Sequence, residues 1–227
     1  MKRFWKDVTT VDGGVQLDGR PVRTPARALL QAPQALAEAV AEEWRAVEGE
    51  LDPRAMRLTG LSNAAIDKAD AALATSVAAY AETDLLCYRA DDPELAEDEA
   101  AAWDPLLDWA RGRYDVAFEV TSGIIHVPQP AETVERLARV VAALDGFQLV
   151  GVQQLTTISG SLVIALALLE GAITPEAAFD TAHLDDLWQA RKWGEDYLAT
   201  AAREARRDDF ISAASFLRLL PKPAQVL

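Results

Sequence analysis

The first thirty residues alternate short apolar segments with turn sequences, a pattern that predicts β-structure. Asp12-Gly13-Gly14 and Asp18-Gly19 indicate hairpin turns, because Asp-Gly pairs favour the tight turns that join antiparallel strands. Pro21 and Pro25 favour edge strands, since proline donates no backbone hydrogen bond. The segments expected as strands are Val8 to Val11, Val15 to Leu17 and Pro21 to Thr24.

Over most of the remaining chain, apolar residues recur every three to four positions, which predicts α-helices. Residues 33–48 form the first expected helix, which begins at Pro33 and carries Trp44 on its apolar face. The segment 162–169 is apolar on every side and is expected to be a buried helix. The other expected helices span residues 62–88, 93–114 and 131–144, with several more from Thr174 to Leu220.

Three segments interrupt this pattern or leave it ambiguous. Asp104-Pro105 lies inside residues 93–114 and is expected to kink or restart that helix, with Asp104 as the N-cap. Residues 116–127 are rich in β-branched side chains around Ser122-Gly123, which predicts a strand or a hairpin. Residues 148–158 fit either a buried strand or a helix.

The order of these elements predicts an α+β protein. A domain boundary is expected near Asp91-Asp92-Pro93. It would separate an N-terminal domain over residues 1–92, with a β-rich start followed by helices, from a mainly α-helical domain over residues 93–227.

The chain has 227 residues and a net charge of −14. This negative field repels phosphate backbones, so we expect no nucleic-acid partner, whereas a basic or apolar protein surface is compatible. No apolar stretch is long enough to span a bilayer, so we expect no membrane insertion. The apolar run of a secretory signal and an Arg-rich presequence are missing after Met1, which predicts a cytoplasmic bacterial protein.

The sequence contains no common signature of catalysis or nucleotide binding, neither a phosphate-binding glycine loop nor a nucleophile elbow. His126 and His183 are expected to be structural or solvent-facing, and no spacing of His and Cys fits a zinc site. Cys87 is expected to be a packed thiol. Paired carboxylates are common among the 36 acidic residues and are expected to form solvated faces. We therefore expect no catalytic residue, no cofactor and no metal.

Six tryptophans stand out, most of them inside short and unusual phrases. Tryptophan is common both in cores and in interface hot spots. We expect Trp44 and Trp103 to be structural anchors, and Trp193 to lie near the surface because Gly194 follows it. The phrases, in chain order, are Arg3-Phe4-Trp5-Lys6, residues 17–25, Glu43-Trp44, residues 56–59, residues 63–67, residues 83–89, residues 103–107, and Gln189 with Trp193-Gly194.

Together these phrases resemble the assembly chaperones that act on the α-subunit of the F1 head of mitochondrial and α-proteobacterial ATP synthases. Each phrase is weak alone, but their number, order and spacing are specific, and they cover nearly the whole chain. The chain departs from the family at Glu99, where a glutamine is expected. It also has a compact Glu195-Asp196-Tyr197 sequence after Trp193-Gly194.

The resemblance implies a small β-rich N-terminal domain, a larger helical domain and a chaperone that needs no nucleotide. Such a protein binds the free α-subunit, prevents its aggregation and releases it to the β-subunit, which requires moderate affinity. Candidate client contacts are Trp193, Glu195, Asp196 and Asp104, and the candidate structural anchors are Trp44, Trp103 and Asp84.

Two hypotheses from other classes stay open. One is a small cytoplasmic hydrolase or transferase that uses an acidic pocket, which would show a deep cleft and a carboxylate of strongly raised pKa. The other is a structural scaffold, which would show a large homodimer interface.

Overall fold

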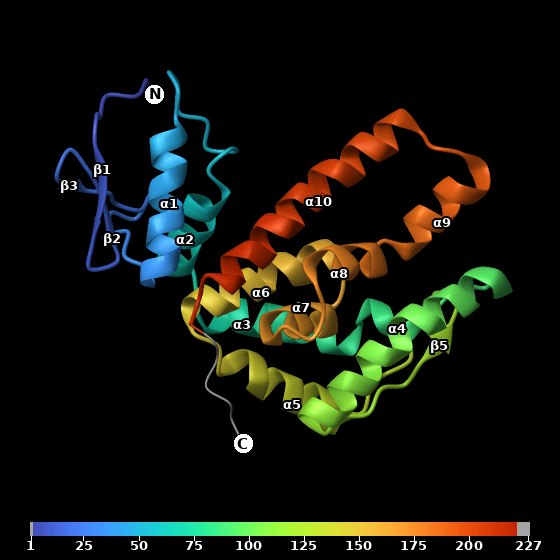
Figure 1. Ribbon diagram of the computed structural model, residues 1–227. Helices are drawn as coiled ribbons and strands as arrows, with labels where there is room; N and C mark the ends of the chain where they lie inside the picture. The colour runs from blue at the N-terminus through green and yellow to red at the C-terminus, as the bar shows by residue number, and fades with distance from the viewer. Residues whose placement is uncertain (1, 222–227) are drawn as a thin grey trace.

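The computed structural model describes residues 2–221. It has a small β-rich lobe, which includes the N-terminus, beside a larger lobe built of helices (Figure 1). This arrangement confirms the predicted α+β class. No helix within the described residues combines the length and the apolar character needed to cross a membrane.

The β-rich lobe is a three-stranded antiparallel sheet covered by one helix. Strands β1 (Val8–Val11), β2 (Gly14–Leu17) and β3 (Arg20–Pro21) pair in chain order. Both Asp-Gly turns have positive φ at both residues, as type I′ hairpins require. Helix α1 (Gln34–Ala46) packs on β1 and β2. The third strand ends at Pro21, whereas the predicted strand ran from Pro21 to Thr24.

The single helix predicted for residues 62–88 is wrong. Two aspartates interrupt it: Asp70 accepts a hydrogen bond from the Leu73 amide at 2.8 Å, and Asp84 accepts one from the Leu86 amide at 3.1 Å. Each of these bonds begins a new short helix. The segment is instead α2 (Arg57–Asp67), α3 (Ala71–Ala78), and the 3₁₀ helices η1 (Ala79–Glu82) and η2 (Leu85–Cys87).

The helical lobe continues with helices of very different length and two short strands. Its elements are β4 (Tyr88–Arg89), α4 (Pro93–Tyr114), β5 (Thr121–Ser122), α5 (Ala131–Ala142), α6 (Gly146–Ser159), α7 (Leu162–Glu170), α8 (Pro175–Ala182), α9 (Leu184–Trp193) and α10 (Tyr197–Arg218). The ambiguous residues 148–158 are therefore helical, and Asp145 caps α6 through a capping box with Gln148.

Two further predictions in this lobe are wrong. Helix α4 runs through Pro105 without a restart, so the predicted restart with Asp104 as its N-cap is wrong, whereas a kink at Pro105 stays a prediction. Side chains on both sides of the proline, Trp103 and Leu107, are buried in one core, which holds the two halves together.

Residues 116–127 form no hairpin. Only Thr121–Ser122 is a strand, and it pairs in parallel with β4. The Gln129 side chain takes the place of a partner strand. Its amide oxygen accepts a bond from the Glu119 N–H at 3.0 Å, and its amide nitrogen donates to the Glu119 carbonyl at 2.9 Å.

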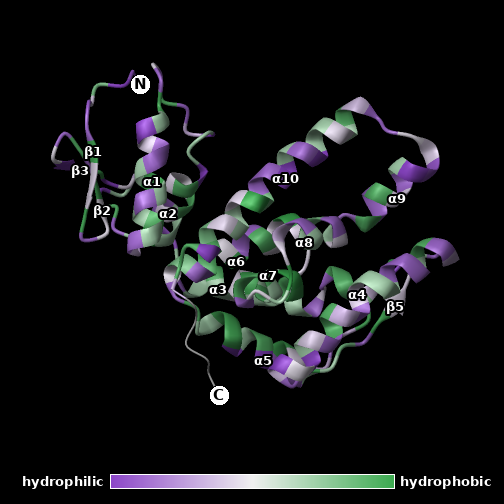
Figure 2. Cartoon of the chain, viewed as in Figure 1, coloured by the Kyte–Doolittle hydropathy of each residue, from purple (hydrophilic) through white to green (hydrophobic). Residues whose placement is uncertain are grey.

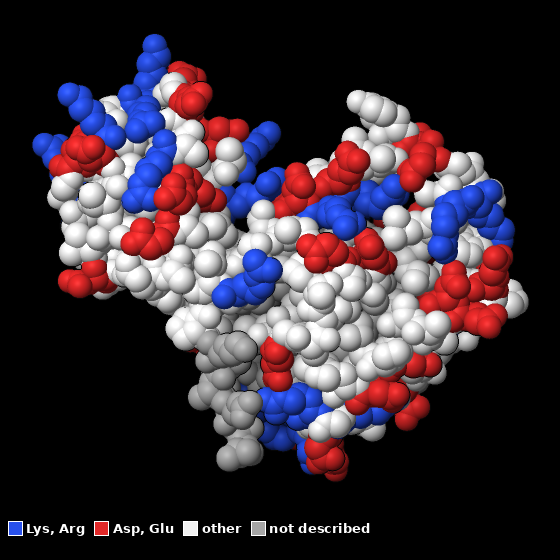
Figure 3. Space-filling view, in the orientation of Figure 1, with Lys and Arg blue, Asp and Glu red and all other residues white. Residues whose placement is uncertain are grey.

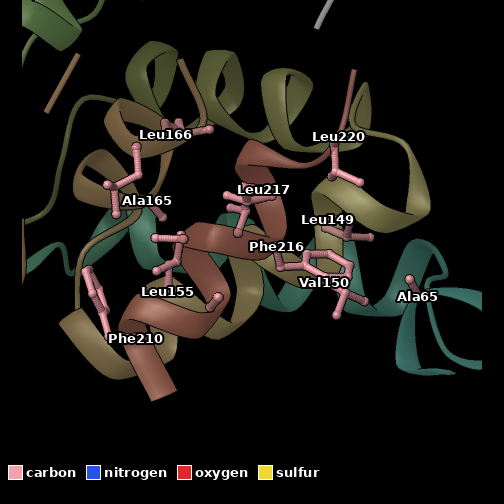
Figure 4. Close-up of a cluster of buried hydrophobic side chains, with 14 of the residues drawn as sticks. Ala65, Leu149, Val150, Leu155, Ala165, Leu166, Phe210, Phe216, Leu217 and Leu220 are labelled. Carbon is pink, nitrogen blue, oxygen red and sulfur yellow. The ribbon is translucent and has the colours of Figure 1, made fainter. Parts of the chain in front are cut away.

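The core of the helical lobe lies between α6, α7 and the C-terminal half of α10. Every residue from Leu162 to Leu168 is buried, which confirms the buried helix. Close packing needs Gly151 on α6, because a Cβ there would lie 2.3 Å from Cδ2 of Leu217 on α10. Figure 4 shows Phe216 and Leu217 of α10 among Leu149, Val150 and Leu155 of α6. Apolar sequence is accordingly dense in α7 (Figure 2).

The division into residues 1–92 and 93–227 stays a prediction. Helix α3 lies before that boundary, yet it packs on α5 and α6 of the helical lobe. Helix α2 packs on α1 and also on α6 and α10. We therefore propose a boundary nearer to Asp70, where α3 begins.

Candidate functional site

Helix α9 and the first half of α10 form an arm that projects from the core. Residues 191–209 include no buried residue, although α10 is helical from Tyr197 onward. Figure 1 shows the junction of the two helices far from the β-rich lobe. A helix without an apolar buried face gains little from tertiary packing, so this surface is a candidate for a partner.

Three large apolar side chains lie exposed at the tip of the arm. The exposed fractions are 70% for Trp193, 83% for Tyr197 and 74% for Leu198. Gly194 ends α9 with a φ of +94°, a conformation that L side chains rarely adopt. Trp193 packs edge-on against the buried Trp188 at 5.6 Å between ring centroids. Exposed apolar clusters of this kind mark interaction sites.

The two predicted client-binding carboxylates, Glu195 and Asp196, lie in this tip and also have local structural partners. Asp196 caps α10 by accepting a bond from the Ala199 N–H at 2.8 Å. Glu195 accepts bonds from the Thr200 hydroxyl and, at 2.9 Å, from Arg203, and these bonds lower its pKa. Asp196 forms no ion pair with any residue in 2–221, so its charge is available to a partner.

Ion pairs hold the arm against the rest of the protein. Lys192 bonds to Asp92 at the start of α4 at 3.1 Å and lowers the pKa of that carboxyl. Exposed pairs of this kind contribute little stability each, so the arm is positioned more weakly than a core helix. Further pairs to the rest of the protein are Lys192–Glu94, Arg191–Asp98, Arg207–Asp180, Arg57–Asp208 and Arg57–Asp209, whereas Arg206–Asp186 joins α10 to α9 within the arm.

A cavity of about 450 Å³ lies beneath the arm, between α4, α8 and α9. Its carboxylates, Asp98 and Asp180, are both paired with arginines. The two carboxyl groups whose pKa burial raises, Asp84 and Glu99, lie outside its lining. The cavity therefore lacks the perturbed carboxylate that an acid–base enzyme would need.

Asp104, the fourth predicted client contact, lies on α4 and faces Arg89. The two side chains are 2.5 Å apart, and Arg89 is buried whereas Asp104 is half exposed. The Arg89 guanidinium lies 5.1 Å from the Trp103 ring centroid, and the Trp103 indole donates to the Thr181 carbonyl at 2.9 Å. Asp104 thus neutralises a buried arginine, and the structure does not bring its carboxylate into the tip of the arm.

The candidate anchors occupy buried positions. Trp103 and Trp44 are 3% and 9% exposed, and Trp44 packs edge-on against Trp5 at 5.2 Å. Asp84 is fully buried and accepts a bond from the Val163 N–H at 3.0 Å, at the start of α7. Burial raises the Asp84 pKa to about 6. Their contributions to stability stay predictions.

The remaining chemical candidates are held in local contacts. Burial raises the pKa of the Cys87 thiol to about 12, which makes it a poor nucleophile. Burial lowers the pKa of His183, which stacks on Phe179. His126 lies at the surface beside Glu82. In residues 2–221, no cluster of His, Cys, Asp and Glu could hold a metal ion.

Glu99, where the family pattern predicts glutamine, is buried and accepts a bond from the Ala90 N–H at 2.7 Å. A glutamine oxygen could accept the same bond, so the departure preserves this contact.

The sequence reasoning missed Tyr197 and Leu198, the two most exposed apolar residues of the tip. The sequence predicted helices from Thr174 to Leu220, with only Trp193 and its acidic neighbours Glu195 and Asp196 near the surface. A signal was present, because residues 199–209 consist mainly of alanine and charged residues and offer no apolar stripe.

Comparisons with known proteins agree with this fold and sequence. Residues 2–111 match the family model described as ATP12 chaperone protein. The mitochondrial protein atp12 of Schizosaccharomyces pombe is 26% identical over 214 residues, which cover 85% of this chain and 74% of the relative.

Solved structures give a stronger likeness. The crystal structure of Atp12 from Paracoccus denitrificans is 40% identical and has a TM-score of 0.90, with 96% of this chain and 97% of that chain covered. A point mutant of the Paracoccus protein matches with the same identity and coverage and a TM-score of 0.89. The chain therefore belongs to the ATP12 family, the assembly chaperones of the F1 sector of ATP synthase.

Proposed function

We propose that this chaperone binds the free α-subunit of the F1 sector, prevents its aggregation and releases it to the β-subunit without nucleotide. The observation that carries the proposal is the exposed apolar tip, Trp193, Tyr197 and Leu198, in a segment (residues 191–209) that includes no buried residue. An unassembled subunit exposes the apolar surface that its neighbour later covers, and this tip offers complementary chemistry.

The size of the tip favours reversible binding. Burying three large apolar side chains contributes about 6 kcal/mol, at about 2 kcal/mol each. Association and side-chain ordering cost about 4–15 kcal/mol, so the tip alone does not make a permanent complex. A β-subunit that buries a larger interface would displace the chaperone by mass action, and no nucleotide is needed for this exchange.

Charge on the tip adds selectivity for a basic client surface. Asp196 carries an uncompensated charge beside the apolar cluster, and we propose that it meets a basic residue of the client. Glu195 contributes less, because Arg203 already neutralises it. Asp104 pairs with Arg89, so its proposed contact requires the client to share that pair.

The test is suppression of α-subunit aggregation, followed by light scattering without ATP. The wild-type chain is expected to suppress aggregation at a stoichiometric ratio, and a Trp193→Ala/Tyr197→Ala/Leu198→Ala variant is expected to lose that effect. The matched control is Ile124→Ala/Ile125→Ala, which removes side chains 98% and 77% exposed on the loop after β5. Unchanged aggregation with the wild-type chain would overturn the function, and equal loss in both variants would overturn the role of the tip.

A further inference from the structure

The sheet segment of the β-rich lobe, residues 1–32, has a charge opposite to that of the rest of the chain. Residues 1–32 contain six basic and three acidic residues, whereas the remaining residues contain sixteen basic and thirty-three acidic ones. Figure 3 shows Lys and Arg side chains over this lobe, with Asp and Glu side chains among them. None of the six basic side chains forms an ion pair within residues 2–221. The sheet segment therefore presents six basic side chains without an ion pair in the described part of the chain, while α1, which covers the sheet, adds Glu38, Glu42, Glu43 and Arg45 to the lobe.

A small apolar cavity of about 260 Å³ opens on the same lobe. Leu17, Val22 and Trp44 contribute apolar walls, and the exposed Arg20 and Arg23 line it beside them. Phe4 also lines the cavity and is 66% exposed. The volume is below the roughly 300–1,000 Å³ of small-molecule sites, and it suits one bulky side chain.

Trp44 in the wall has an unsatisfied donor. Its Nε1 is buried without a hydrogen-bond partner among the described residues. The indole N–H groups of Trp5 and Trp103, in contrast, donate to the carbonyls of Trp44 and Thr181. A buried unpaired N–H costs free energy, so a side-chain movement on binding that brought it to a carbonyl oxygen of the client would relieve that cost.

We propose that this basic-rimmed cavity is a second docking site, which takes an extended acidic segment of the client. A bulky apolar side chain of that segment enters the cavity, and its neighbouring carboxylates meet Arg20 and Arg23. This assignment rests on the proposed function. Apolar walls favour a peptide over a phosphate chain, and the negative charge of the remaining residues repels any long polyanion.

Two separate contacts would also explain how a weak tip retains a client. The apolar tip lies on the helical lobe and the cavity lies on the β-rich lobe, and Figure 1 shows these two lobes apart. Once one contact forms, the other becomes intramolecular, so the overall affinity exceeds that of either. When the β-subunit displaces the chaperone from one of these contacts, the remaining contact is too weak to hold the client, and the chaperone dissociates.

Short overlapping peptides that cover the ATP synthase α-subunit provide the probe. Binding to the full-length chaperone is measured by fluorescence anisotropy at several salt concentrations. We expect at least one acidic peptide to bind, and Arg20→Glu/Arg23→Glu to weaken that binding by about tenfold, with a smaller loss at high salt. Arg139→Glu is the matched control. Arg139 is an exposed arginine of α5 without an ion pair among the described residues, and its replacement should leave peptide binding unchanged.

A nuclear magnetic resonance measurement reports on the cavity itself. The Trp44 indole N–H signal is assigned by its loss in Trp44→Phe. Added peptide should shift this signal and leave the Trp103 signal in place, because Trp103 is buried in the other lobe. Melting curves of the variants confirm that each is folded.

The outcomes separate the two proposals. Absence of any acidic peptide that binds, equal affinity in Arg20→Glu/Arg23→Glu, or an unshifted Trp44 signal would overturn the docking site, even if the wild-type chain suppresses aggregation. Failure of the wild-type chain to suppress α-subunit aggregation would overturn the proposed function, whatever the peptides do.

Discussion

Asp84 offers a stability prediction with a defined sign. Its carboxylate is fully buried and accepts bonds from the N–H groups of Leu86 and Val163, where η2 meets the start of α7. Burial nevertheless raises its pKa from 3.8 to about 6, because desolvation outweighs these bonds. The perturbation is Asp84→Asn, which removes the titration and keeps one acceptor oxygen.

The magnitude follows from proton linkage. Between the unfolded pKa of 3.8 and the folded value of about 6, the folded protein binds more protons than the unfolded chain. Stability from this group is therefore fully present below the unfolded pKa and is lost as the pH rises through the folded pKa. The expected loss between about pH 4.5 and 6.5 is about 2 kcal/mol.

The assay is urea unfolding, followed by circular dichroism across this pH window. The quantity of interest is the difference between the wild-type and Asp84→Asn free energies of unfolding, since other titrations cancel in it. This difference should change by about 2 kcal/mol over the window, with the wild type losing stability relative to the variant as the pH rises. Asp108→Asn, an exposed aspartate paired with Arg111, should give a curve parallel to the wild type there. Parallel curves for wild type and Asp84→Asn would refute the reasoning.

Three further predictions concern packing and the arm. Trp44→Ala should lower the free energy of unfolding by about 3–5 kcal/mol, because its ring is buried, and an unchanged melting temperature would contradict this. Gly151→Ala should destabilise the fold by about 1–2 kcal/mol, because the new Cβ would meet Leu217. Gly112→Ala should stabilise the fold by about 0.5–1 kcal/mol, because the space around Gly112 is open. A higher melting temperature for Gly151→Ala than for Gly112→Ala would be incompatible with this packing. Asp196→Ala should cost about 1 kcal/mol through loss of the α10 cap, whereas Asp196→Asn should keep the cap and lose salt-sensitive client binding; wild-type client affinity in Asp196→Asn would confine this carboxylate to capping.

Local sequence determined those elements whose hydrogen bonds close within a few residues. The Asp-Gly turns form hairpins because both turn residues adopt positive φ, whatever the rest of the chain does. Helix α7 was predictable because a helix that is apolar on every side is stable only when it is buried in the core. The exposure of Trp193 followed from Gly194, which ends α9.

Only the tertiary structure decided what depends on partners distant in sequence. Helix α4 continues through Pro105 because buried side chains hold both halves, and residues 116–127 stay irregular because Gln129 binds their backbone. Asp104 lies within α4 and pairs with Arg89, instead of capping a new helix. The first half of α10 projects from the core because ion pairs, rather than buried side chains, position it. These contacts depend on distances between segments, and the periodicity of a single segment carries no information about such distances.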